Sequence, residues 1–197
     1  MMNAEDKNLL MNQVQTDVSL ISFLIVISVF FIGSLLPKFN SYDLSVDIPI
    51  SFLIVATFAL LFSALILTNA SQIIIEGDLE KVKKYLTNGY AISEYMGVFL
   101  FVLSIPLAVS IITSDFYLRI ITFCAAILGI GFYQFMGFSL LERHFSKKSR
   151  LFSIIFILFG IVLFASQIYA FHFTIVSTAF LLFVLLITAL APLKNFQ

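Results

Sequence analysis

The sequence is built from successive apolar runs, each long enough to cross a lipid bilayer as an α-helix of about 20 residues. These runs begin near residues 18, 48, 93, 120, 151 and 173. Only 11% of the 197 residues are charged, whereas about a quarter are charged in soluble domains. Because backbone polar groups must be hydrogen-bonded inside the hydrocarbon, the runs predict an all-α, polytopic membrane protein.

The runs predict a bundle of about six transmembrane helices that forms a single integral membrane domain over residues 1–197. We expect the helices at residues 18–36, 48–68, 93–113, 120–141, 151–169 and 173–193. Residues 1–17, which end at Asp17, are polar, and we predict that they form a cytoplasmic N-terminus. The first run is too long for the core of a signal peptide and follows this acidic segment, so we favour a retained helix over a cleaved leader.

The last apolar stretch, residues 151–193, contains no Asp, Glu, Lys or Arg. As one helix it would be about 65 Å long, roughly twice the hydrocarbon thickness. It must therefore fold back on itself, and the polar residues Ser166, Gln167 and His172 place the turn. A re-entrant pair of shorter helices is the alternative, because this turn holds no Gly, Pro or Asn.

One long polar stretch, residues 71–94, interrupts the apolar runs. Glu76-Gly77-Asp78 predicts a break and Asn88-Gly89 predicts a helix stop, which leaves an amphipathic surface helix over residues 79–87. Four apolar residues recur at helical spacing on one face of this segment: Ile75, Leu79, Val82 and Leu86. We expect this face to rest on the cytoplasmic membrane surface or on neighbouring helices, where it contacts a partner or couples to a gate.

The basic residues predict the orientation of the bundle. Placing both termini in the cytoplasm puts nine of the eleven Lys and Arg residues inside: Lys7, Lys81, Lys83, Lys84, Arg143, Lys147, Lys148, Arg150 and Lys194. Only Lys38 and Arg119 then lie outside, as the positive-inside rule requires. We predict this topology in the cell membrane. The sequon Asn69-Ala70-Ser71 faces the cytoplasm in this topology, so a glycan there would invert it.

Two of the predicted helices carry unusual residues. Pro106 removes a backbone hydrogen bond from the third helix and predicts a kink, which serves packing or acts as a hinge. In the fourth helix, Gly129, Tyr133 and Gly137 share a stripe that favours close helix packing, and Gln134 is its one central amide. We expect Gln134 to hydrogen-bond a neighbouring helix, or to line a pore in an oligomer.

The histidines and the cysteine of the sequence are not spaced as the common catalytic sites require. His144 and His172 fall on opposite sides of the membrane, and a single cysteine, Cys124, excludes thiol–disulfide exchange within the chain. Asp43 and Asp47 share a loop without further oxygen ligands, so we interpret them as solvated acids rather than a cation site. The sequence predicts no catalytic, cofactor or metal site, and zero net charge argues against a nucleic-acid partner.

The acidic residues Glu94, Asp115 and Glu142 are predicted at helix ends, which argues against proton-coupled transport. The favoured hypothesis is a non-catalytic subunit or scaffold of a membrane complex. Its partners are the lipid bilayer and either other membrane subunits or further copies of the chain. The alternative is a small channel or facilitator for ions or small solutes, for which Pro106, Gln134 and the glycines of the fourth helix are the support.

Overall fold

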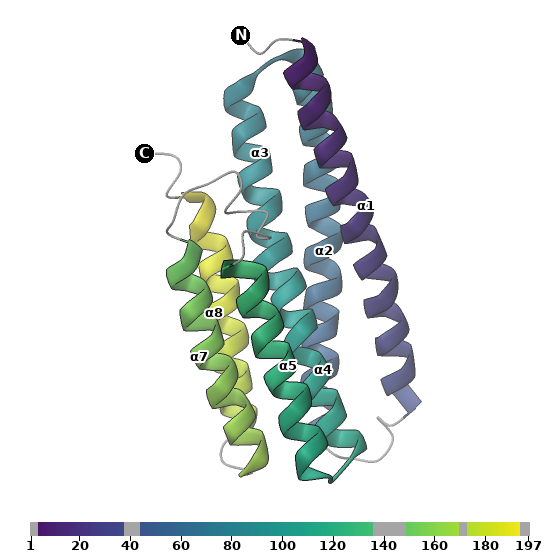
Figure 1. The fold of residues 1–197 in the computed structure, drawn as a ribbon, viewed down its shortest axis with the longest axis vertical. Coiled ribbons are helices and arrows are strands. Elements are labelled where there is room, and N and C mark those ends of the chain that lie inside the picture. Colours follow the sequence, from purple (N-terminus) through teal and green to yellow (C-terminus); the bar gives the residue numbers. More distant parts are fainter. Residues whose placement is uncertain (1–3, 38–43, 136–148, 170–172, 194–197) are drawn as a thin grey trace.

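The computed structural model is helical throughout its regular parts. It describes residues 4–37, 44–135, 149–169 and 173–193, and no strand occurs in these ranges. They form six rods (Figure 1): α1 (Ala4–Leu35), α2 (Leu44–Glu76), a joined rod of α3 (Leu79–Ala91), η2 (Ile92–Val98) and α4 (Phe99–Ile112), then α5 (Phe116–Phe135), α7 (Ser149–Ile168) and α8 (Phe173–Leu193). The all-α prediction is confirmed.

Four of these rods are long and apolar enough to cross a membrane. They are α1, α2, the joined rod and α5, and the described parts of α7 and α8 are shorter apolar helices. Helix α1 lies along α2, which packs on the joined rod, while α5, α7 and α8 complete the bundle on the other side (Figure 1). This architecture agrees with the helical membrane protein that the apolar runs predict.

The first two helices extend beyond the rest of the bundle. Their 32 and 33 residues correspond to about 48 and 50 Å, well above the ~30 Å of a bilayer core. Figure 1 shows the start of α1, the end of α2 and the start of α3 rising together above α5, α7 and α8. This raised end is called the extension below. It contains Lys7 on α1 and the lysines of α3.

The turn between α2 and α3 forms where the sequence predicted a break. Gly77 has a φ of 85°, a left-handed conformation that favours glycine. Asp78 follows as the N-cap, where its side chain accepts a hydrogen bond from the Lys81 N–H at 3.2 Å and pairs with Lys81 Nζ at 2.9 Å. These hydrogen bonds from Lys81 lower the pKa of Asp78. Lys7 Nζ donates to the carbonyl of Ile75 at 3.4 Å, which ties α1 to this turn.

The predicted helix stop at Asn88-Gly89 is wrong, and residues 79–87 are not a separate surface helix. The helix continues through Gly89 into η2 and α4 as one rod, which includes the expected third crossing. Gly89 is buried against α2, where a Cβ would lie 2.7 Å from Leu67 Cδ2. Ser63 Oγ on α2 donates to the Gly89 carbonyl at 2.8 Å. This glycine therefore allows close helix packing and does not end the helix.

The four-residue apolar face predicted for this region is divided by the turn. Val82 and Leu86 are buried in the core. Ile75 belongs to α2 instead, because the chain turns at Gly77, and both Ile75 and Leu79 are exposed. The hydrophobic face of α3 therefore packs onto the bundle through its inner residues only.

The irregular turn of the joined rod does not coincide with Pro106. Helix α4 runs through Pro106, which is buried, and the backbone departs from α-geometry upstream, in the π-helical segment η2. The end of α4 is held by Arg119 of α5, whose guanidinium donates to the carbonyls of Ser110 and Thr113, both at 2.8 Å. Arg119 therefore donates hydrogen bonds to carbonyls that have no partner within the helix at the end of α4.

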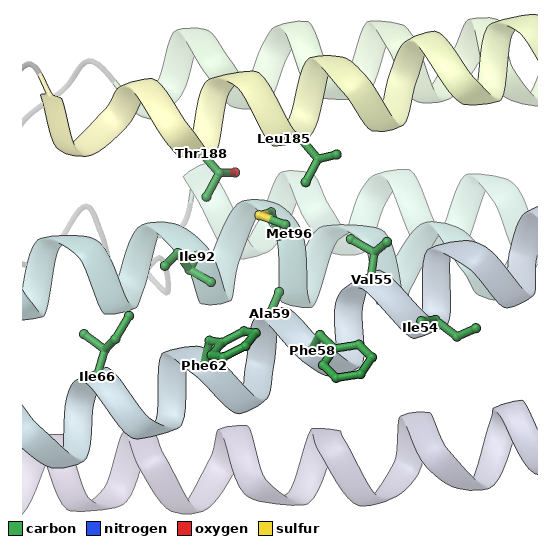
Figure 2. A pocket seen from close by; sticks show the side chains of 10 residues that line it. All are labelled: Ile54, Val55, Phe58, Ala59, Phe62, Ile66, Ile92, Met96, Leu185 and Thr188. Atoms are coloured by element: carbon green, nitrogen blue, oxygen red, sulfur yellow. The ribbon is translucent and has the colours of Figure 1, made fainter.

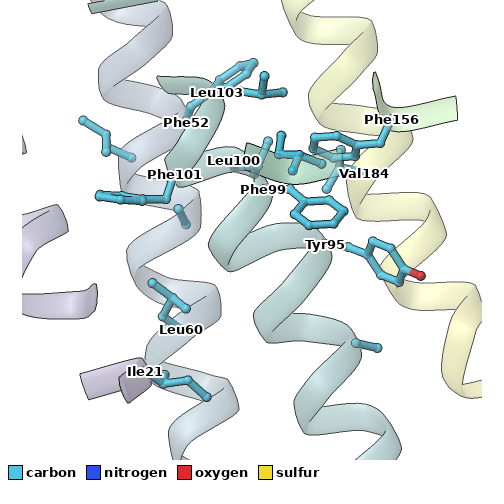
Figure 3. Close-up of a cluster of buried hydrophobic side chains, with 14 of the residues drawn as sticks. Ile21, Phe52, Leu60, Tyr95, Phe99, Leu100, Phe101, Leu103, Phe156 and Val184 are labelled. Atoms are coloured by element: carbon cyan, nitrogen blue, oxygen red, sulfur yellow. The ribbon is translucent and has the colours of Figure 1, made fainter. Parts of the chain in front are cut away.

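A cluster of aromatic rings joins the two sides of the bundle (Figure 3). Phe99 on α4 packs edge to face with Phe156 on α7 at a centroid distance of 4.9 Å. Phe156 packs in turn against Phe180 on α8 at 4.9 Å, and Phe180 stacks on Phe52 of α2 at 5.7 Å. All four rings are buried. Such pairs add about 0.5–1.5 kcal/mol each beyond their area burial.

Candidate functional site

Among the residues that the structure describes, two carboxylates lie inside the helical bundle. Asp17 on α1 is 4% exposed and Glu94 in η2 is 0% exposed. Both belong to segments long and apolar enough to span a membrane. Burying a carboxylate is costly unless it is hydrogen-bonded, paired or protonated. Ionisable groups retained in such helices are functional-site candidates for this reason.

Asp17 is held by a tyrosine from the joined rod. Tyr90 on α3 donates its hydroxyl proton to Asp17 Oδ2 at 2.8 Å, and the Tyr90 side chain is fully buried. The hydrogen bond connects α1 with α3, two helices that are distant in the sequence. Because both partners are buried, removing either one leaves a polar group without this partner in the interior.

Glu94 is held by a tyrosine from α5. Tyr133 donates its hydroxyl proton to Glu94 Oε1 at 3.2 Å. The Tyr133 ring also packs edge to face on Phe99 at a centroid distance of 6.3 Å, which fixes the direction of its hydroxyl. Tyr133 is one of the site residues that the sequence predicts, and the structure places its hydroxyl on a buried carboxylate.

Glu94 lies in the π-helical segment, where the rod also packs closely against α2. A Cβ placed on Gly97 in this segment would lie 2.5 Å from Leu60 Cδ2. Ser93, next to Glu94, is buried as well. Segments of π-helix are rare and often occur at functional sites, because they displace a side chain from the regular helical register. The backbone irregularity and the buried acid therefore coincide.

The two tyrosine–carboxylate pairs follow one another along the joined rod. Tyr90 and Glu94 are four residues apart, which corresponds to about 6 Å or one helical turn. The exposed residue Lys84 lies ten residues before Glu94, about 15 Å along the same rod. The Asp17–Tyr90 pair is thus nearer to the extension and the Glu94–Tyr133 pair is deeper in the bundle.

Sequence reasoning missed both carboxylates for identifiable reasons. Asp17 was assigned to a polar N-terminal segment, but α1 begins at Ala4 and carries Asp17 into the bundle. Glu94 was assigned to a helix end, but the rod does not stop at Gly89. The available signal was the spacing of Tyr90 and Glu94, one turn apart at the start of an apolar run.

The structure describes only some of the other site residues predicted in the fourth helix, residues 120–141. Gly129 is exposed, and a Cβ there would meet no heavy atom of the described chain within 4 Å. The Gln134 side chain and Gly137 lie outside the described residues. Within the described part of the chain, no group of three or more His, Cys, Asp or Glu residues could hold a metal ion. Asp43 lies outside that part, and Cys124 is exposed.

Comparison with known proteins adds no assignment. The chain matches no family model, and no curated protein or solved structure is significantly similar to it. The site must therefore be interpreted from its own chemistry. That chemistry is two buried acids, each holding a tyrosine hydroxyl, in helices that can span a membrane.

Proposed function

We propose that this protein is a small membrane channel or facilitator for protons or small monovalent cations, in which Glu94 binds the transported species. The observation that carries the proposal is the complete burial of Glu94 in a π-helical segment, with a tyrosine hydroxyl on one carboxylate oxygen. A buried carboxylate is stabilised when it takes up a proton or a cation. Exchange between these states lets an acid move charge through a membrane.

The Asp17–Tyr90 pair is the relay between the extension and Glu94 in this proposal. Tyr90 is one helical turn before Glu94 on the same rod, and its hydroxyl contacts the other buried carboxylate, that of Asp17. A hydroxyl both donates and accepts hydrogen bonds, so it can pass a proton between two acids. This role requires no catalytic step, and the protein is proposed to be non-enzymatic.

The proposed topology has six crossings, with both termini in the cytoplasm and the bundle in the cell membrane. Its support is the distribution of bases, nine of which fall on one side. Two observations agree with it: Lys7 contacts the α2–α3 turn, and Arg119 lies at the opposite end of the joined rod. The amphipathic part of α3 is then a cytoplasmic extension of the third crossing, with Lys83 and Lys84 exposed.

A second candidate function is a subunit or scaffold of a membrane complex. The observation that favours it is the open face of α5, where only 11% of the residues in the spanning segment are buried. A Cβ placed on Gly129 or Gly131 of this helix would meet no heavy atom of another part of the described chain within 4 Å. Small residues let another membrane helix approach closely. A Gly129→Leu substitution should disrupt such a complex, measured as a loss of oligomer in mild detergent.

The transport proposal is tested by flux through the purified protein in liposomes. We expect the wild type to collapse an imposed proton or monovalent-cation gradient, and Glu94→Gln to reduce the rate at least about tenfold, as loss of an essential charged group does. Glu80→Gln is the matched control, because Glu80 is an exposed acid on the same rod. A folded wild type that moves neither species, or a flux indifferent to Glu94→Gln, overturns the proposal.

A further inference from the structure

An apolar cavity of about 610 Å³ lies between α2, η2 and α8. Figure 2 shows Phe58 and Phe62 of α2 on one side, Leu185 and Thr188 of α8 on the other, and Met96 between them. Thr188 is the single hydroxyl residue of the lining, and its Oγ1 already donates to the carbonyl of Val184 at 2.8 Å. The cavity therefore offers dispersion contacts to an aliphatic chain and no hydroxyl proton to a polar solute.

A second cavity, of about 200 Å³, lies between the first turns of the same two helices. Its lining contains two apolar residues, Ile48 and Leu181, and five residues with side-chain oxygens: Asp47, Ser51, Thr174, Ser177 and Thr178. The hydroxyls of Ser51, Ser177 and Thr178 donate to carbonyls within their own helices, so their oxygens remain as acceptors. The Asp47 carboxylate forms no ion pair or side-chain hydrogen bond with any described residue.

The two cavities follow one face of each helix. On α2 the lining passes from Ser51 through Val55 and Phe58 to Phe62, and on α8 from Thr178 to Leu185, at the three- and four-residue spacing of a helical face. The apolar part, Ile54 to Ile66 on α2, covers about 18 Å, close to the ~15 Å depth of one leaflet. The two cavities therefore lie one after the other along the same faces of α2 and α8, one with a carboxylate in its lining and one apolar. Together they are called the α2–α8 seam below.

We propose that this α2–α8 seam binds a lipid of the surrounding bilayer that carries a primary ammonium headgroup. One acyl chain lies against Phe58, Phe62 and Leu185, and the ammonium lies beside Asp47. The carboxylate complements a cation and repels a headgroup whose only charge is negative. The surrounding oxygens accept hydrogen bonds, which an ammonium donates and a quaternary choline group does not. This site is separate from Glu94 and does not depend on the transport proposal.

Native mass spectrometry of the purified chain tests the proposal. The protein is reconstituted in nanodiscs with equal amounts of phosphatidylethanolamine, phosphatidylcholine and phosphatidylglycerol that have the same acyl chains, and the lipids retained on release are counted. We expect phosphatidylethanolamine to be retained about tenfold over the other two, as a charge-assisted hydrogen bond implies. Asp47→Asn should reduce this ratio to near one without lowering the total amount of retained lipid.

Two further variants test the chain-binding part of the seam. Leu185→Trp should reduce retention of every lipid, because Leu185 is a partly exposed residue of the lining and a larger ring fills the space. Leu182→Trp is the matched control on the same helix, since Leu182 is exposed and outside the lining. Equal retention of the three headgroups, preference for phosphatidylglycerol or phosphatidylcholine, or retention unchanged by Leu185→Trp overturns the proposal.

Discussion

The joined rod and α5 are both apolar helices that contain glycine, yet the bundle uses them in opposite ways. In their apolar segments 61% of the rod's residues are buried, against 11% of those of α5. Gly97 on the rod faces Leu60 with no room for a methyl group, whereas Gly129 on α5 faces open space. The same small residue therefore allows close packing within the chain in one helix and leaves a face open in the other.

The largest expected effect on this contrast comes from filling the two glycine positions. We expect Gly97→Val to destabilise the fold by about 3 kcal/mol, because the new side chain overlaps Leu60 of α2. Gly129→Val should change stability by less than about 0.5 kcal/mol, since nothing in the described chain is displaced. Denaturant titration in mixed micelles measures both.

The overlap at Gly97 has its own control. In a double-mutant cycle, Leu60→Ala should cost less in the Gly97→Val background than in the wild type, because it relieves the overlap. Additive effects, or equal destabilisation by Gly97→Val and Gly129→Val, would show that the rod is not packed more tightly than α5.

The next effect concerns the buried pair at the extension. Tyr90→Phe removes the hydroxyl that Asp17 accepts at 2.8 Å, and we expect a loss of about 2 kcal/mol, since the carboxylate stays buried without that bond. Thermal unfolding of Tyr90→Phe and Asp17→Asn measures it. Tyr117→Phe is the control, because Tyr117 is an exposed tyrosine of α5. A Tyr90→Phe variant as stable as Tyr117→Phe would contradict the role given to this pair.

A smaller effect on stability is expected at the pair shared by the rod and α5. Tyr133→Phe removes a longer hydrogen bond, 3.2 Å, from a half-buried tyrosine, so we expect a loss of about 1 kcal/mol. Flux should nevertheless fall more than it does for Tyr90→Phe, because Tyr133 contacts Glu94 itself. Stability and flux are measured on the same preparations. A flux equal to that of the wild type would show that Tyr133 of α5 is not part of the transport site.

The smallest effect is expected at the exposed turn of the extension. Hydrogen bonds from Lys81 lower the pKa of Asp78, so the ionised carboxylate stabilises the fold above its unfolded pKa of about 3.9. This contribution is lost as the pH falls through the lower, folded pKa. Asp78→Asn should therefore decrease the melting temperature slightly at pH 7, and the difference from wild type should disappear in acid. A difference that persists in acid would contradict this account.

The sequence predicted those features that depend on local pattern alone. Apolar length gave the membrane class, and Glu76-Gly77-Asp78 gave the α2–α3 turn, because a glycine at φ 85° and an aspartate N-cap are local requirements. The same local reasoning wrongly predicted a helix end at Gly89. Its neighbours along the chain are polar, as at a helix end, but Leu67 of α2, which occupies the space beside it, is distant in sequence.

The site required contacts that no local pattern contains. Tyr133 was recognised as a polar residue in a glycine stripe, yet its partner Glu94 is 39 positions away on another helix. Asp17 was predicted in the polar N-terminal segment because the residues before it are polar, whereas α1 begins at Ala4 and Asp17 is buried. Residue spacing indicated which helices exist, and only their packing determines which acids are buried.

The most direct test of the account is the modification of Glu94 by a hydrophobic carbodiimide, which reacts with protonated carboxyl groups inside a membrane. Labelled residues are identified by peptide mass spectrometry on protein in liposomes, and flux is measured on the same sample. We predict that flux falls in proportion to labelling at Glu94, and that Glu94→Gln is neither labelled there nor inhibited further. Loss of flux with Glu94 unlabelled, or full labelling of Glu94 with flux intact, would contradict the account.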